Sequence, residues 1–317
     1  MNEGGTWALV LAAGDGRRLH SLTTDAQGIA VPKQYCSLRG GPSLLEQALQ
    51  RARSIAAPER VCMVVAAQHR RWWSSALADM PEENVIVQPE NRGTAIGILL
   101  PLLRILERDP QARIVLLPSD HHLRDEHIMA QSLLQAEQHI RVRNDSLLLL
   151  GIEPEEADPG LGYIMPGLSA GPRTYQVAYF VEKPEASVAQ DLISKGALWN
   201  AFIIVAVGDF LLRMFDRKFA DLVTEMRCAV RHGYSTSADV LSGLYAHLPV
   251  LDFSCDIIEG QEACLQVLAV PPCGWSDLGT PGRVVEVLRR TAYRDLPPPA
   301  RGSMACITLA QQTGTNG

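Results

Sequence analysis

The chain of 317 residues carries 29 Lys and Arg against 35 Asp and Glu, which gives a formal net charge of −6, and 47% of its residues are hydrophobic. This hydrophobic content is typical of a globular protein and excludes a largely disordered chain. The acidic balance argues against a nucleic-acid-binding protein, whose phosphate contacts usually require an excess of basic side chains.

The chain shows neither a membrane-spanning segment nor a disulfide framework. Its start lacks the basic and long apolar stretches of a signal peptide, and the apolar runs at 96–106 and 147–152 are interrupted or too short to cross a bilayer. The seven cysteines are scattered without a Cys-x-x-Cys pair, which is typical of reduced thiols in a protein core. We therefore expect a cytoplasmic protein that does not bind membranes.

Buried strands and amphipathic helices alternate along the first half of the chain. Alternation of this kind predicts an α/β fold, with a mostly parallel sheet covered by helices on both faces. Ser43 and Thr94 are expected to cap the helices that follow them. The predicted strands cover 7–12, 61–66, 85–88, 114–117 and 146–152, and the predicted helices cover 43–54, 94–107 and 127–140.

The pattern changes near residue 150. Short strands are predicted at 160–165, 176–182, 198–205 and 265–270, with helices at 186–195, within 210–247 and at 283–290. We find no internal repeat. We expect a single domain over 1–290 whose halves meet near residue 150, followed by a tail over 291–317.

A glycine-containing loop, Ala13-Gly14-Asp15-Gly16-Arg17-Arg18-Leu19, directly follows the first predicted strand. Glycines allow the backbone to approach a phosphate closely, and arginines bind phosphate oxygens. A dinucleotide-binding fingerprint would need a glycine where Leu19 stands, and the Gly-Lys-Ser/Thr of a P-loop is absent. The loop therefore predicts a different kind of phosphate site, with a solvated turn as the alternative. Lys33 follows a polar stretch that could fold over a ligand, although taken singly it fits a surface lysine.

Four later segments place polar side chains near the ends of predicted strands. They contain Asp120, the pair Glu182-Lys183, Asn200 after Trp199, and Asp277 after Trp275. Open α/β sheets bind ligands at the carboxyl ends of their strands, and Mg²⁺ is commonly held by one or two carboxylates together with phosphate oxygens. Taken alone, each segment also fits a structural role as a helix cap, a solvated ion pair or a core Trp.

The order of these segments resembles the sugar-phosphate nucleotidyltransferases, most closely the mannose-1-phosphate guanylyltransferases, over about residues 7–285. The resemblance implies a Rossmann-like α/β fold of the nucleotide-diphospho-sugar transferase type, in which a mostly parallel mixed sheet carries helices on both faces. It also implies that the chain joins a hexose 1-phosphate, first of all mannose 1-phosphate, to a nucleoside triphosphate, first of all GTP, with release of pyrophosphate. Mg²⁺ would be the cofactor, and a homodimer is the assembly that the family suggests.

The resemblance further implies a role for each matching residue. The nucleotide would bind within about 7–150 and the sugar phosphate within about 151–290. Arg18 and Lys33 would be the catalytic cations. The other roles fall to Ala12, Ala13, Gly14, Gly16, Gln88, Asn91 and Thr94 for the nucleotide, to Gly162, Glu182, Lys183 and Asn200 for the sugar phosphate, and to Asp120 and Asp277 for Mg²⁺.

The sequence departs from this family in a few places. Arg17 stands where a small Thr or Ser is usual, Gly93 stands where an Asn is usual, and Ala201-Phe202 replaces Ser-Gly. We expect the ring of Phe202 to crowd the sugar pocket.

Two other interpretations remain open. The chain could be a non-catalytic regulatory relative that binds a nucleotide sugar, or it could perform the same chemistry with another nucleotide or hexose. Retention of Arg18, Lys33, Asp120 and Asp277 favours an enzyme. Leu19 disfavours a third class, the NAD-dependent oxidoreductases.

Overall fold

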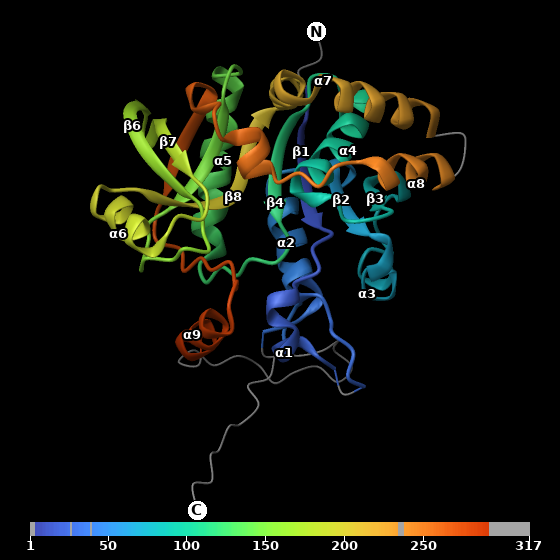
Figure 1. Cartoon of the computed structure of the whole chain (residues 1–317). Coiled ribbons are helices and arrows are strands. Elements are labelled where there is room, and N and C mark those ends of the chain that lie inside the picture. Colours follow the sequence, from blue (N-terminus) through green and yellow to red (C-terminus); the bar gives the residue numbers. More distant parts are fainter. Residues whose placement is uncertain (1–3, 26, 39, 234–237, 292–317) are drawn as a thin grey trace, which may run out of the picture.

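One mixed sheet runs across the molecule (Figure 1). The computed structural model describes residues 4–25, 27–38, 40–233 and 238–291. In this part of the chain the strands follow the order β3-β2-β1-β4-β8-β5-β9-β7-β6. Their bounds are β1 Thr6–Ala12, β2 Val61–Ala66, β3 Val85–Gln88, β4 Arg113–Pro118, β5 Leu147–Ile152, β6 Tyr163–Gly171, β7 Thr174–Val181, β8 Leu198–Val207 and β9 Leu265–Val270.

The predicted α/β fold with a mixed sheet is confirmed, and the sheet combines parallel and antiparallel pairings. Strands β3, β2, β1 and β4 pair in parallel, as do β5 and β9. Strand β8 is antiparallel to both β4 and β5, and β6 and β7 form an antiparallel hairpin. Because β8 comes from the second half of the sequence yet lies between two strands of the first half, both halves share one sheet.

Helices cover both faces of the sheet, as predicted. Successive side chains of a strand point to opposite faces, so Ala8, Val10 and Ala12 join the core under α2, α5 and α9, while Trp7 and Leu9 join the core under α4 and α7. The helices are α1 His20–Thr23, α2 Leu44–Arg53, α3 Arg70–Ala76, α4 Gly93–Arg108, α5 Glu126–Val142, α6 Ala186–Ser194, α7 Gly208–Gly233, α8 Ala238–His247 and α9 Pro281–Thr291.

The two predicted helix caps have different outcomes. Ser43 caps α2 in a full capping box, in which its hydroxyl accepts from the Glu46 backbone N–H and the Glu46 carboxylate accepts from the Ser43 N–H. The prediction for Thr94 is wrong, because α4 already begins at Gly93. The Thr94 hydroxyl instead lies 2.7 Å from the backbone nitrogen of Phe253, which donates to it.

Several element boundaries differ from the predictions in the second half. The strands expected at 160–165 and 176–182 are the two arms of a longer hairpin, β6 and β7, because the polar stretch between them continues the ladder. The helical region at 210–247 contains α7, which bends at Phe219, and α8. The predicted tail lies outside the described residues from residue 292 onward.

Two expectations from composition can be compared with the structure. Of the six cysteines in the described ranges, Cys36, Cys62 and Cys273 are buried, but Cys228 and Cys255 are exposed, so the cysteines do not all lie in the core. No helix among the described residues combines the length and apolar character needed to cross a membrane.

The carboxyl edge of the parallel strands positions the candidate site. The glycine loop leaves β1 at this edge, and the segment that contains Asp120 leaves β4 beside it. After β9, the chain returns to the same edge through a β-bridge, in which the backbones of His122 and Ser276 hydrogen-bond to each other at 2.9 Å in both directions. This bridge brings the two segments that contain Asp120 and Asp277 together.

Candidate functional site

The glycine loop turns sharply at Gly16 and packs against the segment that contains Lys33. Gly16 has φ +64° and precedes a short 3₁₀ turn, Arg17–Leu19. A Cβ atom at this position would lie 3.0 Å from the backbone nitrogen of Lys33. Glycine is therefore required both by the left-handed backbone and by the close approach of the two segments. Leu19 is buried and anchors the end of the loop in the core.

Lys33 lies in the site rather than at the surface. Its side chain is only 8% exposed, and its Nζ lies 2.9 Å from Asp120 Oδ2 and donates to the Asp277 carbonyl oxygen at 2.6 Å. The neighbouring Gln34 holds the loop above it, because its amide donates to the carbonyl oxygens of Ala12 and Gly14. This burial excludes the alternative of a surface lysine.

Asp120 is held as a carboxylate at the end of β4. Burial on its own would raise its pKa, but the ammonium group of Lys33 outweighs this effect, so the pKa of Asp120 is lowered. His121 stays neutral, because burial lowers its pKa to about 3. The Trp275 indole N–H donates to His121 Nδ1 at 3.2 Å, which leaves His121 Nε2 facing Asp120 Oδ1 at 3.8 Å.

Asp277 lies on the other side of Lys33, and its carboxylate has cationic and backbone donors. The Gly279 N–H donates to Asp277 Oδ1 at 3.0 Å, and the Arg283 guanidinium donates to the same oxygen. Burial raises the pKa of Asp277, and the lowering effect of Lys33 does not cancel this shift. The intervening Leu278 has φ +50° and is fully buried, so the chain makes a tight turn around this carboxylate.

The four predicted sugar-phosphate residues form one wall. Gly162 lies against Glu182 so closely that a Cβ atom there would come within 2.5 Å of Glu182 Oε2 and 3.4 Å of Asn200 Cβ. Asn200 donates its backbone N–H to the Gly162 carbonyl oxygen at 2.8 Å. Glu182 Oε2 is buried without a hydrogen-bond partner, whereas Oε1 accepts from Lys183 Nζ at 2.7 Å. This wall therefore presents an unused acceptor and a cation side by side.

Most of the predicted nucleotide residues line one cavity together with Asp120. Gln88, at the end of β3, is buried and donates its amide N–H to the Tyr245 hydroxyl at 3.2 Å. Asn91 accepts from the Gly93 N–H at 3.0 Å, which shapes the turn into α4. Thr94, whose expected cap role was wrong, also lines this cavity.

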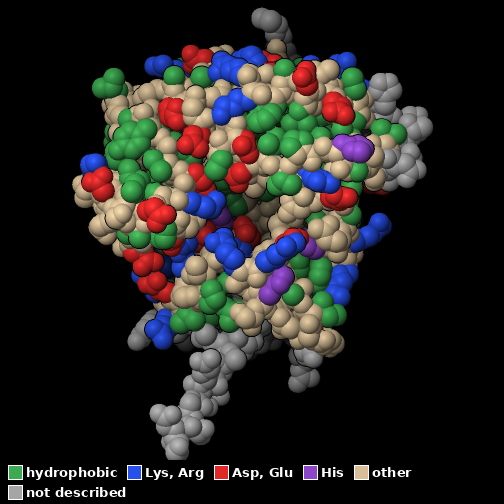
Figure 2. Space-filling view, viewed as in Figure 1, with side chains coloured by type: hydrophobic (Ala, Val, Ile, Leu, Met, Phe, Trp, Pro, Cys, Tyr) green, Lys and Arg blue, Asp and Glu red, His purple; other side chains and the backbone are tan. Residues whose placement is uncertain are grey.

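Two adjoining cavities lie at this edge of the sheet, and Asp120 lines both. In the space-filling view, a hollow opens in the middle of the face, with Lys, Arg, Asp and Glu side chains around it (Figure 2). One cavity is lined by Ala13, Gly14, Gln88, Asn91, Thr94, Asp120, Phe202 and Asp252, among others, and the second by Gly16, Arg17, Arg18, Lys33, Asp120 and Gly279, among others. The structure thus brings glycine loop, cations and carboxylate together.

Among the described residues, no group of three or more His, Cys, Asp and Glu side chains could hold a metal ion. A divalent cation at Asp120 and Asp277 would therefore take its remaining ligands from substrate phosphates and water, which is the usual coordination of Mg²⁺. The donor chemistry fits such an ion, because Asp120 is kept ionised and faces both cavities.

The departures at Gly93 and Phe202 have a structural basis. Gly93 has φ +83°, and the Leu251 backbone occupies the space that a Cβ atom would need. Phe202 has φ +53°, a conformation that disfavours bulky residues. The Asn200 side chain accepts from the Phe202 N–H at 3.0 Å and supports this turn. The ring lines the cavity that contains Gln88 and Asp120, and it packs edge-on against Phe253.

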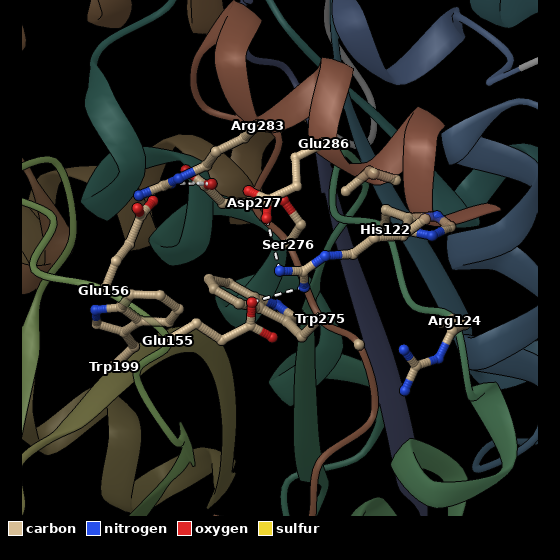
Figure 3. A pocket seen from close by; sticks show the side chains of 13 residues that line it. His122, Arg124, Glu155, Glu156, Trp199, Trp275, Ser276, Asp277, Arg283 and Glu286 are labelled. Atoms are coloured by element: carbon tan, nitrogen blue, oxygen red, sulfur yellow. Dashed lines mark hydrogen bonds and ion pairs between the residues drawn. The ribbon is translucent and has the colours of Figure 1, made fainter. Parts of the chain in front are cut away.

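Some residues at the site carried no sequence signal that we used. Arg283 was expected only as the start of a helix, yet it reaches the Asp277 carboxylate, and a third cavity beside Asp277 includes it together with Trp199 (Figure 3). Val250 and Asp252 line the cavities from a segment that no motif marked. In the sequence, the only feature that could have indicated Arg283 is its position six residues after Asp277.

Known proteins are similar to this chain in sequence. The sequence matches the family described as nucleotidyl transferase over residues 7–293. It is 31% identical over 210 residues to the mannose-1-phosphate guanylyltransferase RfbM of Salmonella typhimurium, covering 65% of this chain and 41% of the relative. It is 26% identical over 304 residues to the mannose-1-phosphate guanylyltransferase of Escherichia coli K12, covering 92% of this chain and 62% of the relative.

A solved structure shows the same fold. The crystal structure described as mannose-1-phosphate geranyltransferase from Thermus thermophilus superposes with a TM-score of 0.76, at 26% identity, and covers 92% of this chain and 80% of that one. The chain spans at most about 60% of the length of the first curated relatives it matches.

Proposed function

Because this chain belongs to the nucleotidyl transferase family, we propose that it joins a hexose 1-phosphate to a nucleoside triphosphate, giving a nucleotide sugar and pyrophosphate. Mannose 1-phosphate and GTP are the proposed substrates, since the two relatives described above are mannose-1-phosphate guanylyltransferases by name. We further propose Mg²⁺ as the cofactor, a cytoplasmic location and a homodimer.

One observation carries the proposal. Lys33 Nζ lies between the Asp277 backbone and Asp120, the carboxylate that lines both cavities. A buried cation with a carboxylate beside a glycine loop is what a triphosphate and its metal ion require. The sugar wall of Glu182 and Lys183 supplies a second place for a phosphate and hydroxyls.

The reaction needs alignment and charge more than proton transfer. The sugar phosphate attacks the α-phosphorus, the new P–O bond forms as the bond to pyrophosphate breaks, and the attacking oxygen is already ionised, because its second pKa is about 6. Arg18 and Lys33 would stabilise charge on the triphosphate. Lys183 would orient the attacking phosphate, and Glu182 Oε2 would accept from a sugar hydroxyl. Mg²⁺, bound by Asp120 and Asp277, would withdraw charge from the reacting phosphates.

Gln88 is the proposed contact for the base. Its nitrogen donates to Tyr245, which leaves its oxygen as the acceptor. Guanine presents N–H donors on its Watson–Crick edge, and such donors would pair with this oxygen.

The test is pyrophosphate release by the full chain with a panel of nucleoside triphosphates and hexose 1-phosphates in the presence of Mg²⁺. We expect Lys33→Ala and Asp120→Ala each to lower turnover by about 10²–10³-fold, as for loss of one preorganised charged group. Lys195→Ala is the matched control, because Lys195 pairs with Asp191 on the surface of α6. Near-normal turnover in both site variants would contradict the proposal, and release with no substrate pair would favour a regulatory protein.

A further inference from the structure

Arg283 joins the Asp277 turn to the sugar wall, although no motif marks it. It lies near the start of α9, and its guanidinium forms ion pairs with both Asp277 and Asp158. All three side chains are largely buried, with exposures of 12%, 12% and 16% for Arg283, Asp277 and Asp158. Figure 3 shows the Arg283 side chain reaching from its helix to the Asp277 carboxylate, beside Glu156.

The Asp158 end of this bridge is rigid. Asp158 Oδ1 accepts from the Gly160 N–H at 2.6 Å. The Tyr163 hydroxyl accepts from the Asp158 N–H at 2.9 Å and donates to the Asp158 carbonyl oxygen at 3.1 Å. Tyr163 is the first residue of β6 and follows Gly162 of the sugar wall. Arg283 is thus held by a carboxylate that is itself fixed to the sheet.

The Asp277 end leaves one oxygen for a ligand. Arg283 and the Gly279 N–H both donate to Oδ1, and in the part of the chain that the structure describes no hydrogen bond is made to Oδ2. The guanidinium carbon lies 6.0 Å from the centre of the Trp199 ring, which limits the rotamers that the arginine can adopt. A carboxylate held at one oxygen by two donors has a fixed orientation for binding at the other.

We propose that Arg283 is a positioning residue for the divalent cation: it holds Asp277 through Oδ1, braced by Asp158, so that Oδ2 faces the ligand. This inference rests on the cation site of the proposed function. Carboxylates that bind metal ions commonly depend on such outer hydrogen bonds, and loss of one typically weakens metal binding about 10–100-fold. Arg283 therefore acts through Asp277 and does not itself contact the substrates.

The test measures binding of Mn²⁺, as a paramagnetic substitute for Mg²⁺, by electron paramagnetic resonance of the full chain together with GTP, against a protein-free sample of Mn²⁺ and GTP. We expect Arg283→Met to raise the Mn²⁺ dissociation constant about 10–100-fold. Arg283→Lys should recover only part of this loss, because a lysine cannot reach both carboxylates with a planar pair of donors. Asp158→Asn removes the charge that holds Arg283 from the other side and leaves Asp277 unchanged. It should also weaken Mn²⁺ binding, and it provides the test if Arg283→Met does not fold.

Arg290→Met is the matched control. Arg290 lies on the same helix, is half exposed and pairs with Glu155 and Glu286, so its replacement should leave Mn²⁺ binding unchanged. Unchanged binding in folded Arg283→Met and Asp158→Asn would overturn the inference, and tighter binding would overturn it by showing that Arg283 competes with the cation. If Asp120→Asn abolishes Mn²⁺ binding while both variants retain it, the cation site stands and only the role of Arg283 fails. If the unmodified chain binds no Mn²⁺, both fail.

Discussion

Replacement of Gly162 by alanine should damage sugar-phosphate binding and little else. The added Cβ atom would lie 2.5 Å from Glu182 Oε2, whereas ordinary contacts begin at 3.4 Å. The Glu182 carboxylate must therefore withdraw by about 0.9 Å. Because the displaced atom ends a flexible side chain, the fold should adapt. A misplacement of about 1 Å can cost about 10²-fold in rate, so we expect kcat/KM for mannose 1-phosphate to fall by about that factor.

Steady-state pyrophosphate release, with each substrate varied in turn, tests this expectation. The KM for GTP should stay within about twofold of the original value, because the nucleotide cavity is lined by other elements. Gly243→Ala is the control: this glycine is exposed on α8, and a Cβ atom there would meet nothing within 4 Å. Its kinetics should not change. Unaltered kcat/KM for the sugar phosphate in Gly162→Ala, or an equal loss with GTP, would refute the reasoning.

Two further changes probe the fold and the specificity of the site. Burial alone would raise the pKa of Glu137, but hydrogen bonds from Thr6, Arg141 and Arg113 lower it overall. The carboxylate therefore stabilises the fold above its unfolded pKa of about 4.3, and this stabilisation is lost as the pH falls through the lower pKa of the folded state. Glu137→Gln should therefore lower the free energy of unfolding by about 2 kcal/mol at pH 7. In urea unfolding between pH 7 and 3, the variant should lose less stability on acidification than the original chain. An equal loss of stability in both would argue against this role. Phe202→Gly removes the ring from the cavity and suits the left-handed backbone. Because the ring lines the cavity that also contains Gln88, we expect this substitution to raise the ratio of kcat/KM for ATP to kcat/KM for GTP about tenfold, and an unchanged ratio would show that the ring does not limit the nucleotide.

Local patterns were enough to predict most of the elements. The apolar run at 61–66 coincides with β2, because a strand buried on both faces favours an unbroken apolar stretch. The mostly apolar segments at 85–88 and 265–270 coincide with β3 and β9. Ser43 could be recognised as a cap since its partner Glu46 lies three residues away. The error at Thr94 arose because the partners of this hydroxyl, Phe253 and Asp252, are remote in sequence.

Strand order and direction required the folded chain. The alternation of strands and helices predicted parallel pairing, but nothing in the sequence of β8 indicates that it enters antiparallel between β4 and β5. A strand carries the same apolar pattern in either direction, and its neighbours are selected by the packing of the whole sheet.

For the candidate site, too, the sequence indicated the residue types but not their arrangement. The residue types and the order of Gly16, Lys33, Asp120, Glu182 and Asp277 were sufficient to indicate phosphate, metal and sugar chemistry. Their arrangement was not, because the salt bridge between Lys33 and Asp120 and the approach of Gly162 to Glu182 depend on the meeting of strand ends. Arg283 illustrates the difference best: its partners Asp277 and Asp158 lie six and 125 positions away, and only the packing of α9 against the sheet brings one guanidinium to both carboxylates.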